Sequence, residues 1–342
     1  MSPAKAFTCR ERGFSLIELM VGIVVALIAV VVVMQVFRLS ESSRRTTTGG
    51  DDAQTTGIIS LTVLQRHVQQ AGQGFSSELT MGCDINLRAG IADVTNAGGI
   101  TINHPIIPAG DANTDTLLIF YGSSNGATEG LRINTQPGAA TYAVASAQTF
   151  TTNDWVMAAR SPRPAPCALS LTQVTAEPVG SNVTVATGMP GASNGGLFNL
   201  GQRPAVLAYA IRNGQLTQCD FQTQDCTKTD AANWPAFGEG VVSLRAEYAK
   251  DTNKDSVVDT FDQATPTTVC GWYQTAAVRL GLLVRSGQLE KEDVAQAAPS
   301  WEASASAQFV APGSDWQRYR YKTFETTVPL RNIGWVGVPT SC

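Results

Sequence analysis

The fold is decided near the N-terminus by the stretch Gly13-Phe-Ser-Leu-Ile-Glu-Leu-Met-Val-Gly-Ile-Val-Val-Ala-Leu-Ile-Ala-Val-Val-Val-Val-Met-Gln-Val-Phe37. Only Ser15, Glu18 and Gln35 interrupt it with polar side chains. A helix that spans a bilayer needs roughly 20 mostly apolar residues. The stretch therefore predicts a transmembrane helix over residues 14–37.

Two simpler interpretations of this helix are a cleaved secretory signal and a plain single-span anchor. A secretory signal ends its apolar region with a small-x-small cleavage site, whereas this region ends in Met34-Gln-Val-Phe-Arg-Leu-Ser-Glu41. A plain anchor accounts for the length but not for Glu18, because an ionised group inside an apolar helix costs roughly 2.5 to 3.5 kcal/mol on insertion scales. Basic residues flank both sides and do not decide the orientation. They are Lys5, Arg10, Arg12, Arg38, Arg44 and Arg45.

The segment Gly13-Phe14-Ser15-Leu16-Ile17-Glu18-Leu19-Met20 resembles the type III signal of type IV pilins and type II secretion pseudopilins. The resemblance implies that a prepilin peptidase cuts after Gly13, so that residues 1–13 form a leader peptide, and that Phe14 becomes N-methylated. It also implies that the Glu18 carboxylate neutralises the new Phe14 ammonium of a neighbouring subunit as helices bundle. The implied fold is pilin-like α+β, with a long N-terminal helix packed on a mostly antiparallel β-sheet domain that carries long loop insertions.

The composition is that of a globular chain outside this segment. The 342 residues are 43% hydrophobic and 15% charged, which leaves room for a sizeable core. The formal net charge is -4, and no run of Lys or Arg stands out beyond the first apolar segment. Nucleic acid is therefore not an expected partner, because phosphate binding requires clustered cations.

Residues 38–74 predict a helical continuation of the apolar segment with one apolar side. The apolar residues that recur at helical spacing are Ile58, Leu61, Leu64 and Val68. We expect this amphipathic helix to lie against a sheet, to break or bend at Gly49-Gly50, and to stop at Gly72 and Gly74.

Residues 75–342 predict a periplasmic, β-rich domain with antiparallel pairing. Runs with strand-like composition occur at residues 116–121, 154–159, 205–211 and 241–248. The strongest predicted strands are residues 276–285 and 319–330. A polar insertion with the sequence Glu290-Lys-Glu-Asp293 lies between these two.

Three segments also resemble the large minor pilins called PilW. They are Leu64-Gln-Arg-His-Val-Gln-Gln-Ala-Gly72, Ala277-Val-Arg-Leu-Gly-Leu-Leu-Val-Arg-Ser286 and Phe324-Glu-Thr-Thr-Val-Pro-Leu-Arg-Asn332. This resemblance implies a minor pilin of the inner membrane that joins other minor pilins, starts polymerisation of the major pilin and helps to display a tip adhesin. It leaves residues 75–240 largely uncovered.

The cysteines indicate the compartment of the domain. Loss of the leader removes Cys9 and leaves six, an even number that suits up to three disulfides in an oxidising compartment such as the periplasm. The six are Cys83, Cys167, Cys219, Cys226, Cys270 and Cys342. Fifteen pairings are possible, of which we favour Cys219 with Cys226 and Cys270 with Cys342; buried free thiols are the alternative. A zinc site is not expected, since there is no C-x-x-C pair and only two histidines.

A twelve-residue segment, residues 251–262, has the ligand spacing of a calcium loop. Oxygen ligands at positions 1, 3, 5, 9 and 12 and a backbone carbonyl at position 7 would surround Ca²⁺. These positions are Asp251, Asn253, Asp255, Asp259, Asp262 and Val257. Ser256 departs from the pattern, because the turn prefers glycine, and Asp262 is shorter than the usual glutamate. The alternative is a solvated turn rich in Asp and Asn.

Enzymatic functions find no support in the sequence. It contains no G-x-S-x-G elbow, no P-loop and no H-E-x-x-H motif, and neither His67 nor His104 has a visible catalytic partner. We therefore expect a structural and assembly protein, a PilW-like minor pilin. The alternatives are a type II secretion pseudopilin, which shares the signal, and an adhesive binding module exposed at a pilus tip.

Overall fold

The computed structural model describes residue 13 and residues 15–124, 126–127, 129–333 and 342. The chain divides into two units, Met1–Asp51 and Asp52–Cys342. Helix α1 (Leu16–Gln70) contributes to both units. The expected break at Gly49-Gly50 is wrong as far as helical structure is concerned, because α1 continues through both glycines. A glycine inside a helix costs about 1 kcal/mol relative to alanine, which destabilises a helix without ending it.

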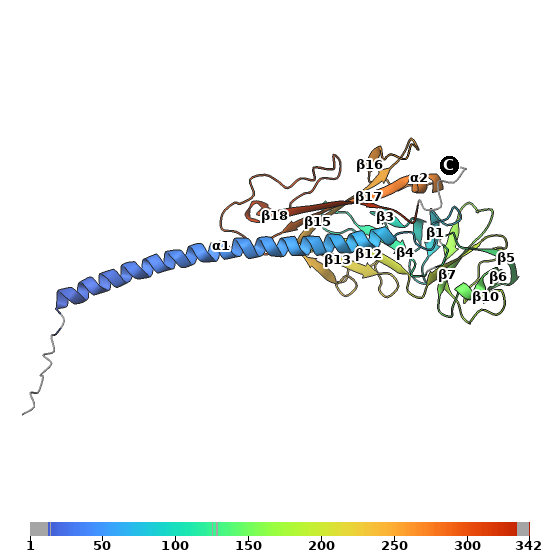
Figure 1. Ribbon diagram of the computed structural model, residues 1–342, viewed down its shortest axis with the longest axis horizontal. Coiled ribbons are helices and arrows are strands. Elements are labelled where there is room, and N and C mark those ends of the chain that lie inside the picture. Colours follow the sequence, from blue (N-terminus) through green and yellow to red (C-terminus); the bar gives the residue numbers. More distant parts are fainter. Residues whose placement is uncertain (1–12, 14, 125, 128, 334–341) are drawn as a thin grey trace, which may run out of the picture. The chain divides into compact units, whose positions relative to one another are not determined.

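Two antiparallel sheets form the part of the second unit that carries the helix (Figure 1). The first has the order β14-β13-β12-β4-β3 and the second the order β16-β15-β17-β18. The strands of the first are β3 (Ile100–Ile102), β4 (Leu117–Tyr121), β12 (Ala205–Arg212), β13 (Gln215–Asp220) and β14 (Ala236–Glu239). Those of the second are β15 (Val241–Lys250), β16 (Thr260–Asp262), β17 (Thr275–Arg285) and β18 (Tyr321–Pro329).

The middle of the chain forms two further sheets. A six-stranded antiparallel sheet has the order β10-β6-β5-β11-β7-β9, and a three-stranded sheet has the order β2-β1-β8, in which β1 and β8 are parallel. Their strands are β1 (Cys83–Asn86), β2 (Val94–Ala97), β5 (Leu131–Gly138), β6 (Thr141–Val144), β7 (Trp155–Ala159), β8 (Ala168–Ser170), β9 (Thr172–Gln173), β10 (Asn182–Thr184) and β11 (Gly196–Gly201). The short helices are η1 (Ala147–Thr149), α2 (Val269–Tyr273) and η2 (Trp316–Arg318).

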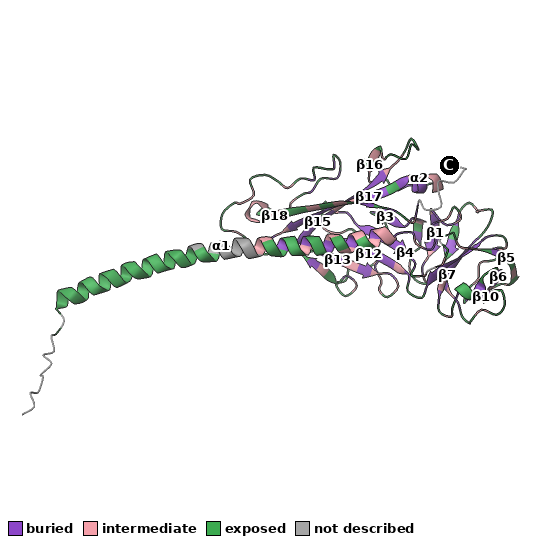
Figure 2. Cartoon of the chain, in the orientation of Figure 1, coloured by how far each residue is buried: buried purple, intermediate pink, exposed green. Residues whose placement is uncertain are grey.

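One stripe of α1 within the second unit packs against the sheets (Figure 2). Its buried residues are spaced three or four apart, as one face of a helix requires, and Ala71 just beyond the helix continues the stripe. The residues of the stripe are Ala53, Gly57, Ser60, Leu64, Val68 and Ala71. A Cβ on Gly57 would lie 2.1 Å from the ring of Phe324 in β18, so this glycine permits the close approach. Ile58, which the sequence pattern placed on the apolar side, is half exposed.

The end of the helix follows the sequence closely. α1 stops at Gln70, and Gly72 and Gly74 adopt φ values of 81° and 87°. This is the left-handed region that glycine enters without steric cost. Both glycines therefore end the helix as predicted.

The predicted strands are confirmed, and the core extends into the region that the sequence left uncovered. The six expected runs appear as β4, β7, β12, β15, β17 and β18. Residues of the six-stranded sheet form a hydrophobic cluster of their own, which includes Ile133, Tyr142 and Leu197. The fold is α+β with long loops, as expected.

The polar insertion between β17 and β18 folds back onto the second sheet. Trp301 and Phe309 stack with ring centroids 5.9 Å apart and cover Gly281 of β17. Below them, Glu247 is 1% exposed and forms an ion pair with Arg279. Ser304 and Ser306 donate hydrogen bonds of 2.6 and 2.8 Å to the Glu247 carboxylate, so the insertion satisfies this buried charge.

Candidate functional site

The N-terminal site begins with an exposed glycine and an acid in the first helical turn. Gly13 is exposed, and Ser15 N donates a hydrogen bond of 3.3 Å to Glu18 Oε2. A carboxylate at this position also lies favourably at the positive end of the helix dipole. Phe14, the predicted methylation site, lies outside the described residues. Gly13 and Glu18 are therefore both exposed in the isolated chain.

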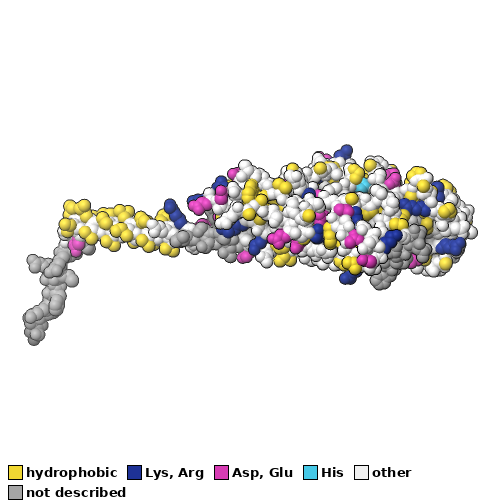
Figure 3. Space-filling model, turned by 90° about the horizontal axis from the view of Figure 1, so that it is seen from above, with side chains coloured by type: hydrophobic (Ala, Val, Ile, Leu, Met, Phe, Trp, Pro, Cys, Tyr) yellow, Lys and Arg dark blue, Asp and Glu magenta, His cyan; other side chains and the backbone are white. Residues whose placement is uncertain are grey.

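The apolar part of α1 buries none of its side chains. In the described part of the chain one helical segment, Leu16–Arg38, is long and apolar enough to cross a membrane, and 0% of its most apolar window is buried. Figure 3 shows hydrophobic side chains covering this segment. Exposed apolar surface of this extent is unfavourable in water, so the segment requires a lipid or protein environment that the isolated chain does not supply.

All six cysteines retained after the proposed cleavage are paired. Cys83 in β1 pairs with Cys167, Cys219 in β13 pairs with Cys226, and Cys270 in α2 pairs with Cys342. The two pairings favoured from the sequence are therefore both present. The bond between Cys83 and Cys167 closes the longest loop and joins β1 to the start of β8. Three such bonds are typical of a domain in an oxidising compartment.

The predicted calcium loop adopts a tight turn that hydrogen-bonds to itself. The Asp251 carboxylate accepts bonds of 2.7 to 3.2 Å from the backbone N–H groups of Lys254, Asp255 and Ser256. Ser256 has a φ of 69°, the conformation for which a glycine was expected at this position. A serine here adopts the backbone conformation in which calcium loops place a glycine.

The acids of this loop already have protein partners. Hydrogen bonds from the hydroxyls of Thr260 and Thr252 hold the pKa of Asp259 below its usual value. Asp262 forms an ion pair of 2.5 Å with Lys250 Nζ. Throughout the described ranges, no three His, Cys, Asp or Glu side chains are gathered in an arrangement that could hold a metal. Calcium binding would therefore require these carboxylates to exchange their present hydrogen-bond and ion-pair partners for the ion.

Two parts of the chain match models of known protein families. Residues 208–332 match the family described as Type IV Pilus-assembly protein W, and residues 8–34 match the prokaryotic N-terminal methylation motif. The chain matches a prepilin-type pilin of the PilW family. No curated protein and no solved structure matches it. The first match covers the chain from within β12 to the end of β18, and the second covers most of the apolar part of α1.

Both histidines are partly or fully buried and contact neighbouring polar groups. His67 Nδ1 lies 2.7 Å from Tyr121 Oη, and burial, assisted by the charge of Arg66, lowers the pKa of His67. His104 accepts a hydrogen bond from Ile106 N at Nδ1, and its Nε2 lies 3.0 Å from Thr95 O. Burial lowers the pKa of His104 as well. Both imidazoles therefore act as neutral packing and hydrogen-bonding groups, and the family match indicates a structural component of the pilus.

The structure also contains a polar cavity that the sequence did not predict. Its volume is about 610 Å³. The residues that line it are Ser123, Ser124, Gly126, Thr149, Thr151, Asp154, Asn199, Gly201, Gln202 and Arg203. They come from separate segments of the uncovered region, so no local spacing in the sequence could have indicated that they meet. The signal was limited to the abundance of Ser, Thr and Asn there.

Proposed function

We propose that this chain is a minor pilin that takes part in assembly or initiation of a type IV pilus. In this proposal prepilin peptidase cuts after Gly13, Phe14 is N-methylated, and the mature chain enters a filament or tip complex through α1. The observation that carries the proposal is the match of residues 8–34 to the methylation motif, joined to an apolar helix that buries no side chain of its own. Neighbouring pilin helices or lipid would cover that surface.

Glu18 has a specific part in this proposal. Its carboxylate would pair with the Phe14 ammonium that cleavage creates on a neighbouring subunit, which would offset the cost of an ionised group in apolar surroundings. In the uncleaved chain this carboxylate accepts a hydrogen bond from the backbone N–H of Ser15, the residue just before α1. Glu18→Gln would therefore leave cleavage intact and reduce incorporation into filaments.

The same reasoning gives the topology and the partners. The three disulfides support a periplasmic location for the second unit, with a single pass through the inner membrane before assembly. The partners would be other minor pilins, the major pilin and prepilin peptidase, with a tip adhesin as a further candidate. The match of residues 208–332 to the pilus-assembly family favours a pilus over a type II secretion system.

Intact-mass measurement of the membrane-extracted protein, from cells with and without prepilin peptidase, tests the proposal directly. The expected product is a chain that starts at methylated Phe14 only when the peptidase is present. Gly13→Val should block the cut, whereas Gly22→Val, with no atom near its Cβ position, should not. An uncut wild-type chain, or one trimmed beyond Phe37, would instead favour a plain anchor or a secreted protein.

We further propose that residues 251–262 bind Ca²⁺ and that the ion fixes this loop between β15 and β16. The proposal is supported by the ligand spacing and by the turn at Ser256. Calcium should raise the midpoint of thermal unfolding relative to EGTA, and Asp255→Asn should remove that rise. Asp293→Asn, an exposed acid outside the loop, is the matched control. Equal midpoints with calcium and with EGTA would exclude a bound ion of structural importance.

A further inference from the structure

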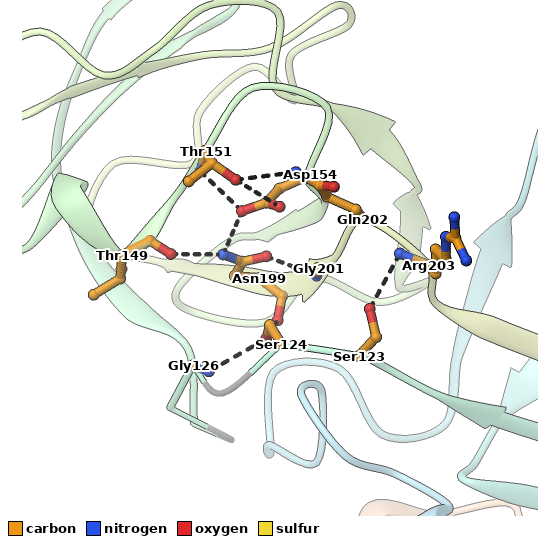
Figure 4. A pocket seen from close by; sticks show the side chains of 10 residues that line it. All are labelled: Ser123, Ser124, Gly126, Thr149, Thr151, Asp154, Asn199, Gly201, Gln202 and Arg203. Atoms are coloured by element: carbon orange, nitrogen blue, oxygen red, sulfur yellow. Dashed lines mark hydrogen bonds between the residues drawn. The ribbon is translucent and has the colours of Figure 1, made fainter.

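The polar cavity lies where two sheets of the second unit meet. Ser123 and Ser124 follow the end of β4, Asn199 and Gly201 belong to β11, and Thr149 and Thr151 lie at and just beyond η1 (Figure 4). Its volume of about 610 Å³ is in the range of small-molecule sites. The cavity is therefore large enough for one or two sugar rings rather than for a single ion.

The floor of the cavity is a buried pair of polar side chains. Asp154 is 6% exposed and Asn199 is 5% exposed. Asn199 Nδ2 donates hydrogen bonds of 2.9 Å to Asp154 Oδ2 and to Thr149 O, and its Oδ1 accepts one of 2.8 Å from Gly201 N. Thr151 adds two donors to Asp154, its backbone N–H at 2.9 Å and its hydroxyl at 3.1 Å. These bonds hold the floor in one geometry before any ligand arrives.

A glycine keeps the two sheets close enough to form the cavity. Gly201 has a φ of 74°, and a Cβ there would lie 2.6 Å from Ser123 Oγ. Ser123 Oγ instead accepts a hydrogen bond of 3.1 Å from Arg203 N. Any other residue at position 201 would push the end of β11 away from the segment after β4, so the cavity depends on this close approach.

The floor and rim retain capacity to accept hydrogen bonds. Among the described residues, Thr151 Oγ1 alone donates to Asp154 Oδ1, although a carboxylate oxygen can accept two bonds. Gln202 donates through Nε2 to Thr151 Oγ1 and Thr152 O, and its Oε1 accepts no hydrogen bond from any described residue. A ligand that satisfies these oxygens must supply O–H or N–H donors.

The lining excludes several other ligand classes. None of the lining side chains is aromatic or a large aliphatic group, so the cavity offers no platform for a base or an apolar side chain. The buried floor carries the negative charge of Asp154, and the guanidinium of Arg203 extends away from it (Figure 4). Phosphates and other compact anions are therefore disfavoured.

We propose that this cavity binds a neutral saccharide unit. Sugar hydroxyls donate hydrogen bonds, which matches the remaining acceptor capacity of Asp154 and Gln202. The hydroxyl oxygens of Thr149 and Ser124, whose own protons go to Ser146 O and Asn199 O, can accept as well. The inference concerns a ligand of the exposed domain and does not depend on processing at Gly13. A chain that fails to bind saccharide could still assemble into a pilus, and the reverse also holds.

The experiment is saturation-transfer NMR on the full chain in a detergent without a sugar headgroup, with methyl β-D-glucopyranoside and methyl β-D-galactopyranoside as probes. A ligand of this size reaches dissociation constants on the order of 1 mM. Sodium glucuronate serves as the charged counterpart and should bind more weakly, because its carboxylate approaches Asp154.

Gln202→Ala should weaken binding about fivefold through the loss of a hydrogen-bonding group, and Thr149→Tyr, at the exposed rim, should block the cavity.

Gln288→Ala is the matched control, because Gln288 is exposed in the insertion between β17 and β18, outside the cavity. Thermal unfolding of each variant shows that its fold is retained. Binding of at least one neutral glycoside by the wild type and Gln288→Ala, with weaker binding in Gln202→Ala and none in Thr149→Tyr, supports the proposal. Three results would overturn it: no transfer from either glycoside to the wild type, transfer to both cavity variants equal to that of the wild type, or tighter binding of glucuronate than of the neutral glycosides.

Discussion

The two parts of helix α1 use apolar residues in opposite ways. Residues 16–38 carry mostly large aliphatic side chains on all sides of the helix, and all of these residues are exposed. The part within the second unit buries one stripe, and half of that stripe consists of Ala53, Gly57 and Ser60. The first pattern fits a helix whose surroundings are lipid or other helices, whereas the second fits a helix that approaches its own domain closely. The same helix therefore has one part that packs against its own domain and one part whose apolar surface the chain itself leaves uncovered.

The largest expected contrast between these parts is in domain stability. Leu64→Ala should lower the free energy of unfolding of the second unit by about 2 to 5 kcal/mol, because Leu64 is 0% exposed within the core. Leu27→Ala removes the same atoms from a side chain that is 59% exposed, and should leave this free energy unchanged. Chemical denaturation of the full chain in detergent, followed by tryptophan fluorescence, measures both. Equal losses would mean that the apolar part also supports the domain.

Substitution of one glycine in each part of the helix, Gly57 and Gly22, tests the same contrast with a smaller expected change in unfolding free energy. Gly57→Ala should cost about 1 to 3 kcal/mol, since the new methyl group would displace the Phe324 ring. At Gly22 nothing lies within 4 Å of the added Cβ, and Gly22→Ala should leave domain unfolding unaffected. Thermal unfolding of the two variants beside the wild type measures the difference. A neutral Gly57→Ala would show that helix and β18 separate easily, and would weaken the account of the small residues in the stripe.

The two glycines also show what could and could not be predicted from the sequence. Apolar length, strand-like runs and the stop at Gly72 are local signals, and the corresponding elements form. The predicted apolar side is confirmed at Leu64 and Val68 and wrong at Ile58, which is half exposed. Gly57 is buried instead, against Phe324 from a segment more than 260 residues away. The cavity around Asp154 and Asn199 could not be predicted for the same reason, since its parts meet only through tertiary pairing.

The smallest expected effect is the pH dependence that His67 gives to the docked part of α1. Burial and Arg66 lower the pKa of His67 in the folded chain below the unfolded value of about 6.5, so protonation favours the unfolded state. Its stabilisation is fully present above pH 6.5 and is lost as the pH falls below that value. The same sign applies to His104, whose pKa is also lowered.

His67→Gln should therefore reduce the fall in unfolding free energy between pH 7.5 and pH 5, without abolishing it, because His104 remains. The groups that face His67 are the Tyr121 hydroxyl, the Tyr209 ring at 6.1 Å and the neighbouring Arg66. None of these three supplies a negative charge that would stabilise the imidazolium. Urea denaturation at the two pH values measures the change. The same decrease in variant and wild type would mean that His67 is protonated equally in the folded and unfolded states.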